Sequence, residues 1–162
     1  MTNSSDIPQL PSTDPLQNPP QLLTGNWYEY PVTAHPHTTD YAGIVWHGSY
    51  IAWLEEARVE CLAQKGINFA ELVAWGCDLP VVELAIRYHQ PIQMGTRVIV
   101  KTQMAGINGV RVNWDYQIQS ADGKHLYATA RVTLVPVDRE KGKIMRQLPA
   151  AVKDALTKLA DG

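Results

Sequence analysis

Apolar and polar residues alternate along several stretches of the chain, and this alternation is typical of half-buried β-strands. The first stretch covers residues 27–34, where Pro31 predicts an edge strand or a bulge. Further alternating stretches fill the second half of the chain, at residues 80–88, 98–104, 110–118 and 126–134. Short turn-like segments join them at residues 91–95, 108–109 and 121–123, so we expect antiparallel neighbours.

A helical repeat separates the first strand from the others. Between residues 47 and 64, one face of the predicted helix carries Tyr50, Leu54, Ala57 and Cys61, which fall within about 60° of one another. Gly66 suits the position just beyond the helix end. Helices are also predicted near residues 68–75 and 149–160. This order of elements predicts an α+β fold, with a curled antiparallel sheet wrapped around a long central helix.

The composition is that of one globular domain. The chain has 162 residues, of which 45% are apolar and 19% are charged. No apolar run approaches the roughly 18 residues that a membrane span requires. Cys61 and Cys77 form neither a disulfide framework nor a metal-binding spacing, which favours a reducing compartment.

The N-terminal part of the chain differs from the rest. Residues 1–24 contain five prolines and predict a flexible leader, and residues 25–162 are expected to form the domain. Residues 1–57 contain six acidic residues and no Lys or Arg, so they lack the basic character of secretory and transit signals. We therefore expect a cytoplasmic protein, and we expect no nucleic-acid partner because no strongly basic face is evident.

The candidate chemistry lies between residues 39 and 50. Asp40 stands on a loop that contains Gly43, and His47 follows seven residues after Asp40, where the long helix is predicted to begin. A carboxylate can act as a nucleophile or a general base. The first N–H groups of a helix lack internal partners and favour negative charge. Acyl transfer needs both parts, so this spacing predicts acyl-transfer chemistry.

The same residues carry a family resemblance. The pattern Asp40-x-x-Gly43-x-Val45-x-His47-x-x-Tyr50, followed by Glu55-Glu56-Ala57-Arg58, resembles the signature of hotdog-fold thioesterases of the 4-hydroxybenzoyl-CoA thioesterase type, which include the Tol–Pal-associated acyl-CoA thioesterases. The resemblance implies hydrolysis of an acyl-CoA thioester without cofactor or metal. It also implies a homodimer or homotetramer with sites at subunit interfaces. His35-Pro36-His37 and Trp46 fall outside the matched positions.

The resemblance also implies roles for single residues. Asp40 would attack the thioester carbonyl or activate water, and the backbone N–H of His47 would polarise the carbonyl. Gly43 is expected to adopt a positive φ or to allow close approach of the acyl group. Outside the resemblance, the aromatic side chain of Trp46 makes it a candidate wall of the acyl pocket, and Tyr50 either lines that pocket or only packs in the core. The alternative for Asp40 is a turn-forming role.

Other charged residues have weaker claims to a function. Glu56 follows His47 by nine residues, as in another branch of hotdog thioesterases, but it lies off the apolar face and favours a solvated or interface carboxylate. A basic cluster after the last strand either binds CoA phosphates or is a solvated loop: Arg139, Lys141, Lys143 and Arg146. No third ligand accompanies His35 and His37, so no metal site is expected.

Three alternative functions remain open on the sequence. The carrier of the acyl group could be acyl carrier protein instead of CoA. A hotdog hydratase or dehydratase would act on similar thioesters, and it would need a paired acid and base. A non-catalytic module would bind acyl thioesters without turnover. Aromatic and fatty acyl groups both suit the aromatic content of the chain.

Overall fold

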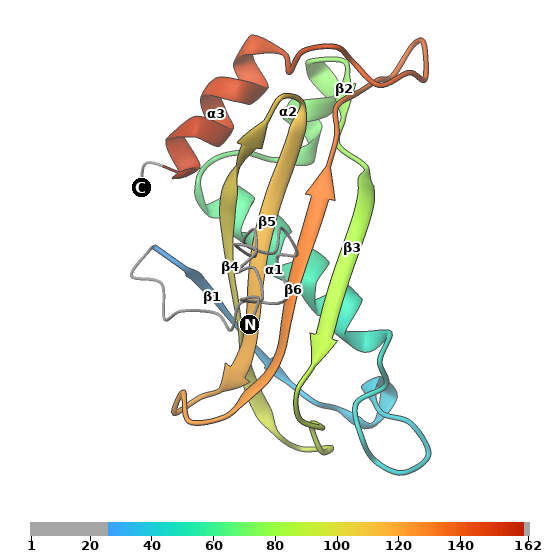
Figure 1. Cartoon of the computed structure of the whole chain (residues 1–162), viewed down its shortest axis with the longest axis vertical. Helices are drawn as coiled ribbons and strands as arrows, with labels where there is room; N and C mark the ends of the chain where they lie inside the picture. The colour runs from blue at the N-terminus through green and yellow to red at the C-terminus, as the bar shows by residue number, and fades with distance from the viewer. Residues whose placement is uncertain (1–25, 161–162) are drawn as a thin grey trace, which may run out of the picture.

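The computed structural model describes residues 26–160. The predicted leader, residues 1–24, lies outside the described residues. Five strands form one antiparallel sheet (Figure 1). In spatial order they are β1 (Tyr28–Thr33), β4 (Arg97–Asn108), β5 (Arg111–Ser120), β6 (Leu126–Leu134) and β3 (Val81–Tyr88).

The strand pairing confirms most of the expected neighbours and corrects one. Tight turns join β4 to β5 and β5 to β6, as predicted, and Pro31 lies on an edge strand, β1. However, β3 pairs with β6 and not with β4. Residues 89–96 therefore form no hairpin, because they cross the end of the sheet past β5 and β6. The distance from β3 to β4 is three strand spacings, roughly 14 Å, and eight residues can span it.

Three very short elements were not predicted. They are η1 (Pro36–Thr38), β2 (Cys77–Asp78) and β7 (Val137–Asp138), and the two strands pair with each other in a separate small sheet. Two residues are too few to produce a readable alternation of apolar and polar positions. This small sheet lies beside the start of β3, where the N–H of Val135 donates to the carbonyl of Pro80 at 3.2 Å.

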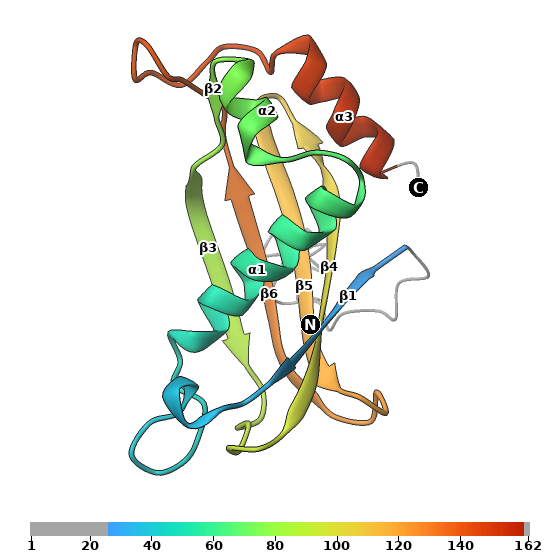
Figure 2. The same ribbon diagram turned by 180° about the vertical axis from the view of Figure 1, so that it is seen from behind.

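The predicted helix over residues 47–64 is α1 (Ser49–Gln64), which crosses one face of the sheet obliquely (Figure 2). All four residues of the predicted apolar face are buried: Tyr50, Leu54, Ala57 and Cys61. The helix begins two residues later than expected, with Gly48 as its N-cap. Gly66 follows the helix end with φ +78°, which confirms its predicted place.

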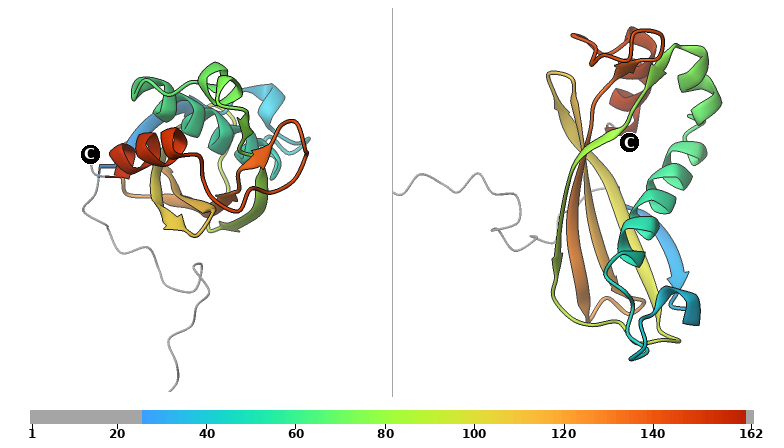
Figure 3. Two further views of the ribbon diagram at one scale, coloured as in Figure 1. Left: turned by 90° about the horizontal axis from the view of Figure 1, so that it is seen from above. Right: turned by 90° about the vertical axis from the view of Figure 1, so that its right-hand side faces the viewer.

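Two further helices complete the layer on the helix side of the sheet (Figure 3). In α2 (Phe69–Ala74), the side chain of Asn68 caps the first turn by accepting from the N–H of Glu71 at 3.0 Å. α3 (Ala150–Ala160) is the predicted closing helix, and it buries Val152 and Leu156. The predicted α+β class is therefore confirmed, with an antiparallel sheet that carries its helices on one face.

Strand β5 shows how the two faces of the sheet differ. Its inward residues are buried: Val112, Trp114, Tyr116 and Ile118. On the outward face, Asp115 accepts two hydrogen bonds from Arg131, at 2.6 and 2.9 Å. Such a bidentate pair is the strong geometry for an Arg–carboxylate contact. The polar outward face can stay in water, whereas the apolar inward face must be covered, and the helices cover it.

One charged side chain lies within the apolar layer. Arg58, on α1, is buried, forms an ion pair with Glu55 and donates to the hydroxyl of Tyr116 at 3.0 Å. The burial of Arg58 was not predicted from the sequence. A buried guanidinium stays charged, so each of its N–H groups needs an acceptor.

We expect Tyr116→Phe to destabilise the fold by about 1–3 kcal/mol, because it leaves a buried N–H of Arg58 without its acceptor. The matched control is Tyr127→Phe. Its hydroxyl has no hydrogen-bond partner among residues 26–160, so the change should cost much less. Urea unfolding of the two variants and the native protein measures both values. Equal free energies of unfolding for the two variants would contradict this account of Arg58.

Candidate active site

The segment before α1 is a short hairpin, hereafter the 38–46 hairpin. The N–H of Trp46 donates to the carbonyl of Thr38 at 2.9 Å, and the N–H of Asp40 donates to the carbonyl of Ile44 at 2.8 Å. At its base, the hydroxyl of Ser49 donates to the carbonyl of Thr38 at 2.8 Å. Ser49 is the first residue of α1, so the hairpin is joined directly to the helix N-terminus.

Asp40 lies at the exposed end of this hairpin. Its Oδ1 accepts from the N–H groups of Ala42, at 2.8 Å, and Ile44, at 3.2 Å. This is the turn-forming role that the sequence left as an alternative. The second oxygen, Oδ2, has no hydrogen-bond partner within the described part of the chain. One oxygen therefore holds the turn, and the other is free to react.

Gly43 has the backbone conformation expected for it. Its φ is +74°, in the left-handed region that favours glycine, and its carbonyl accepts from the N–H of Met94 at 2.9 Å. An added Cβ would meet no atom within 4 Å. The glycine is therefore required by backbone geometry and not by lack of space.

His47 lies one residue before the N-cap, not in the first turn of the helix as expected. Trp46 and Gly48 form a turn before α1, in which the N–H of Ser49 donates to the carbonyl of Trp46 at 2.9 Å. The carbonyl of His47 accepts from the hydroxyl of Tyr88 at 2.8 Å. Its own N–H has no acceptor within residues 26–160. The helix dipole favours negative charge at this end.

Tyr88 is a residue of this site that sequence analysis missed. It lies on β3, and its ring meets that of Tyr50 edge-on at 4.9 Å. Burial raises the pKa of both hydroxyls, that of Tyr50 to about 12, so Tyr88 stays a donor to His47 at neutral pH. Tyr50 itself is buried in the core. The sequence offers one hint of this role, because Tyr88 is a polar residue at the end of an otherwise aliphatic face of β3.

Trp46 and Gly48 form a close contact at the start of α1. A Cβ on Gly48 would lie 2.2 Å from the indole ring of Trp46, although the φ of −74° and ψ of −24° suit any residue. Gly48 is therefore required by the ring and not by the backbone. The indole is 53% exposed and lies at 4.9 Å from the imidazole of His47.

A groove of about 540 Å³ opens between β1 and the first half of α1. The unmatched His35-Pro36-His37 segment lies on it, with the two imidazoles stacked at 5.8 Å. Glu56 also lines it and accepts from the hydroxyl of Tyr30 at 3.2 Å. The lining contains no Lys or Arg, and its aromatic members are Tyr30, Trp46 and Trp53.

The basic cluster lies at the other end of the molecule. Residues 138–144 form a second hairpin, in which Asp138 accepts from the N–H groups of Glu140 and Lys141, both at 2.9 Å. These bonds lower the pKa of Asp138, that from Lys141 most. Arg139 pairs with Asp78 at 3.3 Å. Figures 1 and 2 show this hairpin beside β2, away from the N-terminal end of α1.

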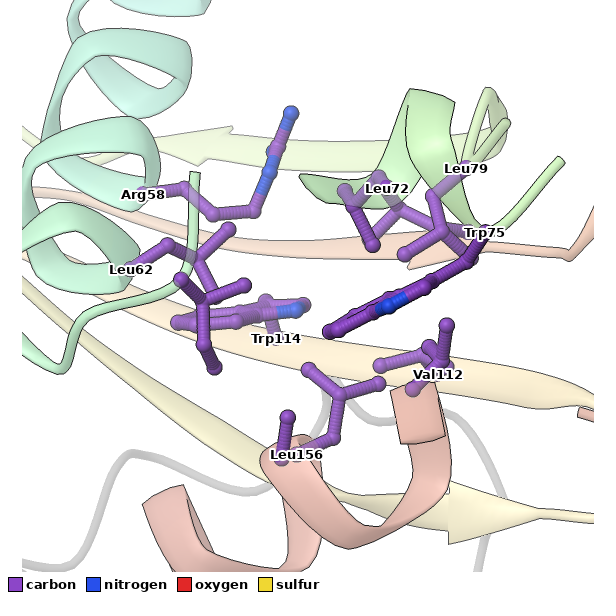
Figure 4. Close-up of a pocket in the computed structure, with 12 residues that line it drawn as sticks. Arg58, Leu62, Leu72, Trp75, Leu79, Val112, Trp114 and Leu156 are labelled. Carbon is purple, nitrogen blue, oxygen red and sulfur yellow. The ribbon is translucent and has the colours of Figure 1, made fainter. Parts of the chain in front are cut away.

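A small apolar cavity of about 20 Å³ lies under α3, at the far end of α1 (Figure 4). Trp75 and Trp114 border it, and Arg58 stands at its edge. The volume is that of about one water molecule, and apolar walls offer such a water few partners. This cavity holds none of the candidate residues.

Other kinds of chemistry find little support in the described residues. Burial raises the pKa of the Cys61 and Cys77 thiols, which makes both poor nucleophiles. Within residues 26–160, no group of three His, Cys, Asp or Glu side chains is placed to hold a metal ion. No helix in the same range is long and apolar enough to cross a membrane.

Comparison with known proteins agrees with the geometry. Residues 34–156 match the model of the thioesterase-like superfamily. The chain belongs to this superfamily. It is 50% identical over 139 residues to sll0410 of Synechocystis sp., a protein provisionally named an esterase, with coverage of 86% of this chain and 84% of the relative.

Two more comparisons agree with this superfamily, one in sequence and one in fold. An acyl-CoA thioester hydrolase of Escherichia coli, YbgC, is 28% identical over 125 residues, which cover 77% of this chain and 92% of the relative. The structure of a 1,4-dihydroxy-2-naphthoyl-CoA thioesterase from Synechocystis superposes with a TM-score of 0.73 at 24% identity, over 82% of this chain and 97% of that one. The hotdog thioesterase fold and the predicted enzyme class, a thioester hydrolase, are confirmed at the level of the superfamily.

The contact between Trp46 and Gly48 gives a prediction on stability. Gly48→Ala should destabilise the native protein by about 1–3 kcal/mol, the usual cost of overpacking. In a Trp46→Ala background the same change should cost nothing or stabilise, because alanine is better than glycine in a helical conformation. A double-mutant cycle by urea unfolding measures the coupling. Equal effects of Gly48→Ala in both backgrounds would show that the ring is not the constraint.

Proposed function

We propose that this protein hydrolyses acyl-CoA thioesters to a free acid and CoA, with Asp40 and the N–H of His47 as the reacting groups. The observation that supports this most strongly is the free Oδ2 of Asp40 on a hairpin joined to the N-terminus of α1. Trp46, which pairs with Thr38, directly precedes His47 in the chain. Asp40 lies two residues beyond Thr38, roughly 7 Å along an extended chain. A thioester carbonyl can therefore approach both groups.

Asp40 can act in two ways. As a nucleophile, its Oδ2 attacks the carbonyl carbon, the C–S bond breaks, CoA leaves as a thiolate that takes up a proton, and water then hydrolyses the acyl anhydride. As a general base, Oδ2 takes a proton from water, and that water attacks the carbonyl. Both routes need an unprotonated, accessible carboxylate and consume one water.

The N–H of His47 is proposed to receive the oxyanion that forms in either route. A well-aimed donor of this kind contributes about 2.7–4 kcal/mol to lowering the barrier. Tyr88 supports this role, because its hydroxyl holds the carbonyl of His47 and so fixes the adjoining peptide. Tyr50 packs behind Tyr88 and is proposed to position its ring.

The acyl group is proposed to lie in the groove between β1 and α1. The groove reaches the helix start through Gly48 and Ser49, and Trp46 forms part of its wall. Its lack of Lys and Arg suits an uncharged acyl group better than the phosphates of CoA. Gly43 shapes the turn that presents Asp40 to this end.

The name of the Escherichia coli relative supports CoA as the carrier. On the pattern formed by Asp40, Gly43, His47 and Tyr50, we propose that the protein belongs to the 4-hydroxybenzoyl-CoA and Tol–Pal-associated group. Two free, buried thiols suit a reducing compartment, and we propose the cytoplasm.

We also propose that the protein is a homodimer. β3 is an edge strand with four exposed apolar residues: Val81, Val82, Leu84 and Tyr88. An exposed apolar edge strand is a template for pairing with another chain, so a soluble protein usually covers it. Pairing through β3 would also extend the expected curl of the sheet around α1.

We expect Asp40→Asn to lower the rate of thiol release from acyl-CoA by at least about a hundredfold. Asparagine keeps the Oδ1 acceptor for Ala42 and Ile44, so the hairpin should stay folded. The matched control is Asp122→Asn, since Asp122 forms a similar turn by accepting from the N–H of Lys124 at 2.9 Å. A thiol-reactive dye measures both rates.

The control variant should keep the native rate. Undiminished release by Asp40→Asn would exclude Asp40 and make Glu56 the next carboxylate to substitute. Release of hydrated product without free acid, from an unsaturated acyl-CoA, would instead favour the hydratase alternative.

His47→Ala should lower the same rate by much less than the roughly hundredfold expected for loss of an oxyanion donor. The substitution removes the exposed imidazole and keeps the backbone N–H. Thiol release with the alanine variant, beside Asp40→Asn, measures the difference. A loss as large as that of Asp40→Asn would mean that the imidazole takes part in the reaction.

A further inference from the structure

The groove between β1 and α1 has two unlike ends. β1 lies beside α1 and runs in the opposite direction (Figure 2). At one end of the groove, the hydroxyl of Ser49 donates to the carbonyl of Thr38 at 2.8 Å, next to the proposed reacting groups. At the other end, the hydroxyl of Tyr30 donates to Oε2 of Glu56 at 3.2 Å. The groove therefore leads from the proposed thioester site to a carboxylate.

The carboxylate of Glu56 has no cation beside it. Within the described part of the chain Glu56 forms no ion pair, and the groove lining contains neither Lys nor Arg. Its neighbour on the helix, Glu55, is paired with Arg58. Burial raises the pKa of the Tyr30 hydroxyl, and the negative charges of Glu56 and Glu60 raise it further. The far end of the groove is thus negative and lacks a counter-charge.

Aromatic rings line the same groove. Tyr30 lies at the Glu56 end, Trp46 lies at the Ser49 end, and Trp53 comes between Ser49 and Glu56 on α1. The faces of such rings attract cations, and quaternary ammonium groups are the best-known ligands of this kind. An alkyl group would contact the rings but leave the carboxylate without a partner, which is costly once water is excluded. A cation suits both features.

We propose, on the basis of the thioesterase function above, that the acyl group carries a positive charge at its far end, an amine or a quaternary ammonium group, which binds Glu56 and the aromatic walls of the groove. Ser49 and Glu56 are seven residues apart on α1, roughly 10 Å along the helix axis. Helix side chains lean toward the N-terminus, so the carboxylate is expected somewhat closer to Ser49. An extended chain advances roughly 3.5 Å for every three bonds, so about six bonds reach the carboxylate.

Two acyl-CoAs of the same shape test this proposal. One is hexanoyl-CoA with a trimethylammonium group at the chain end, and the other carries a tert-butyl group in its place, so the two differ in charge alone. The native protein should release thiol from the cationic substrate with a kcat/KM at least roughly tenfold higher, because only that substrate gains from the carboxylate and the rings.

Glu56→Gln separates the effect of the carboxylate from that of the rings. Glutamine keeps an acceptor for the hydroxyl of Tyr30 and removes the charge. The ratio of the two kcat/KM values should fall by at least about fivefold, since the cationic substrate loses attraction and the neutral one no longer covers a charge. The matched control is Glu60→Gln, one turn further along α1. Glu60 is exposed and does not line the groove, so the ratio should change by less than about twofold.

Several results would overturn the proposal. They are equal turnover of the two substrates, a preference for the neutral one, and a preference that Glu56→Gln leaves intact or that Glu60→Gln removes as fully. An equal loss with both substrates in Glu56→Gln would place the carboxylate in the reaction and would also exclude the selective role. All of these results leave the thioesterase proposal standing, because each includes thiol release by the native protein. Absence of release from every acyl-CoA would contradict that proposal itself.

Discussion

The packing of α1 against the sheet is the constraint on which the site depends. Four residues spaced three or four apart bury one side of this helix, and their burial fixes both its axis and its point of entry. Because Ser49 of the first turn binds the carbonyl of Thr38, the 38–46 hairpin follows the helix wherever it packs. Tyr88 then ties the peptide at His47 to β3. The segment with the proposed reacting groups is thus held from the helix and from the sheet at once, and a carboxylate that acts on a substrate carbonyl needs such support.

The distribution of charge along the chain takes on a spatial meaning in the fold. The first 57 residues, which lack Lys and Arg, supply β1, the hairpin with Asp40 and the start of α1. The later residues supply the basic hairpin at the other end of β3. One end of the described chain therefore lacks Lys and Arg, and the basic hairpin lies at the other end.

Local patterns predicted the elements that local contacts determine. The alternation around β5, the glycine turns beside it and the apolar face of α1 all depend on neighbours a few residues away. The turn at Asp40 and the positive φ of Gly43 could be predicted because their geometry is set within one turn. The errors concern contacts between distant segments. The crossing at residues 89–96 depends on which strand β3 pairs with. The contact between Tyr88 and His47 spans 41 residues.

The central claim is that this protein breaks thioesters at the start of α1. The most direct test incubates the native protein with a panel of aromatic and aliphatic acyl-CoAs and follows both thiol release and the appearance of free acid by mass spectrometry. The account predicts that thiol and acid appear in equal amounts from at least one acyl-CoA, at a rate proportional to enzyme concentration. Tight binding of acyl-CoA without any thiol release would contradict it and would identify a binding module on a hotdog fold.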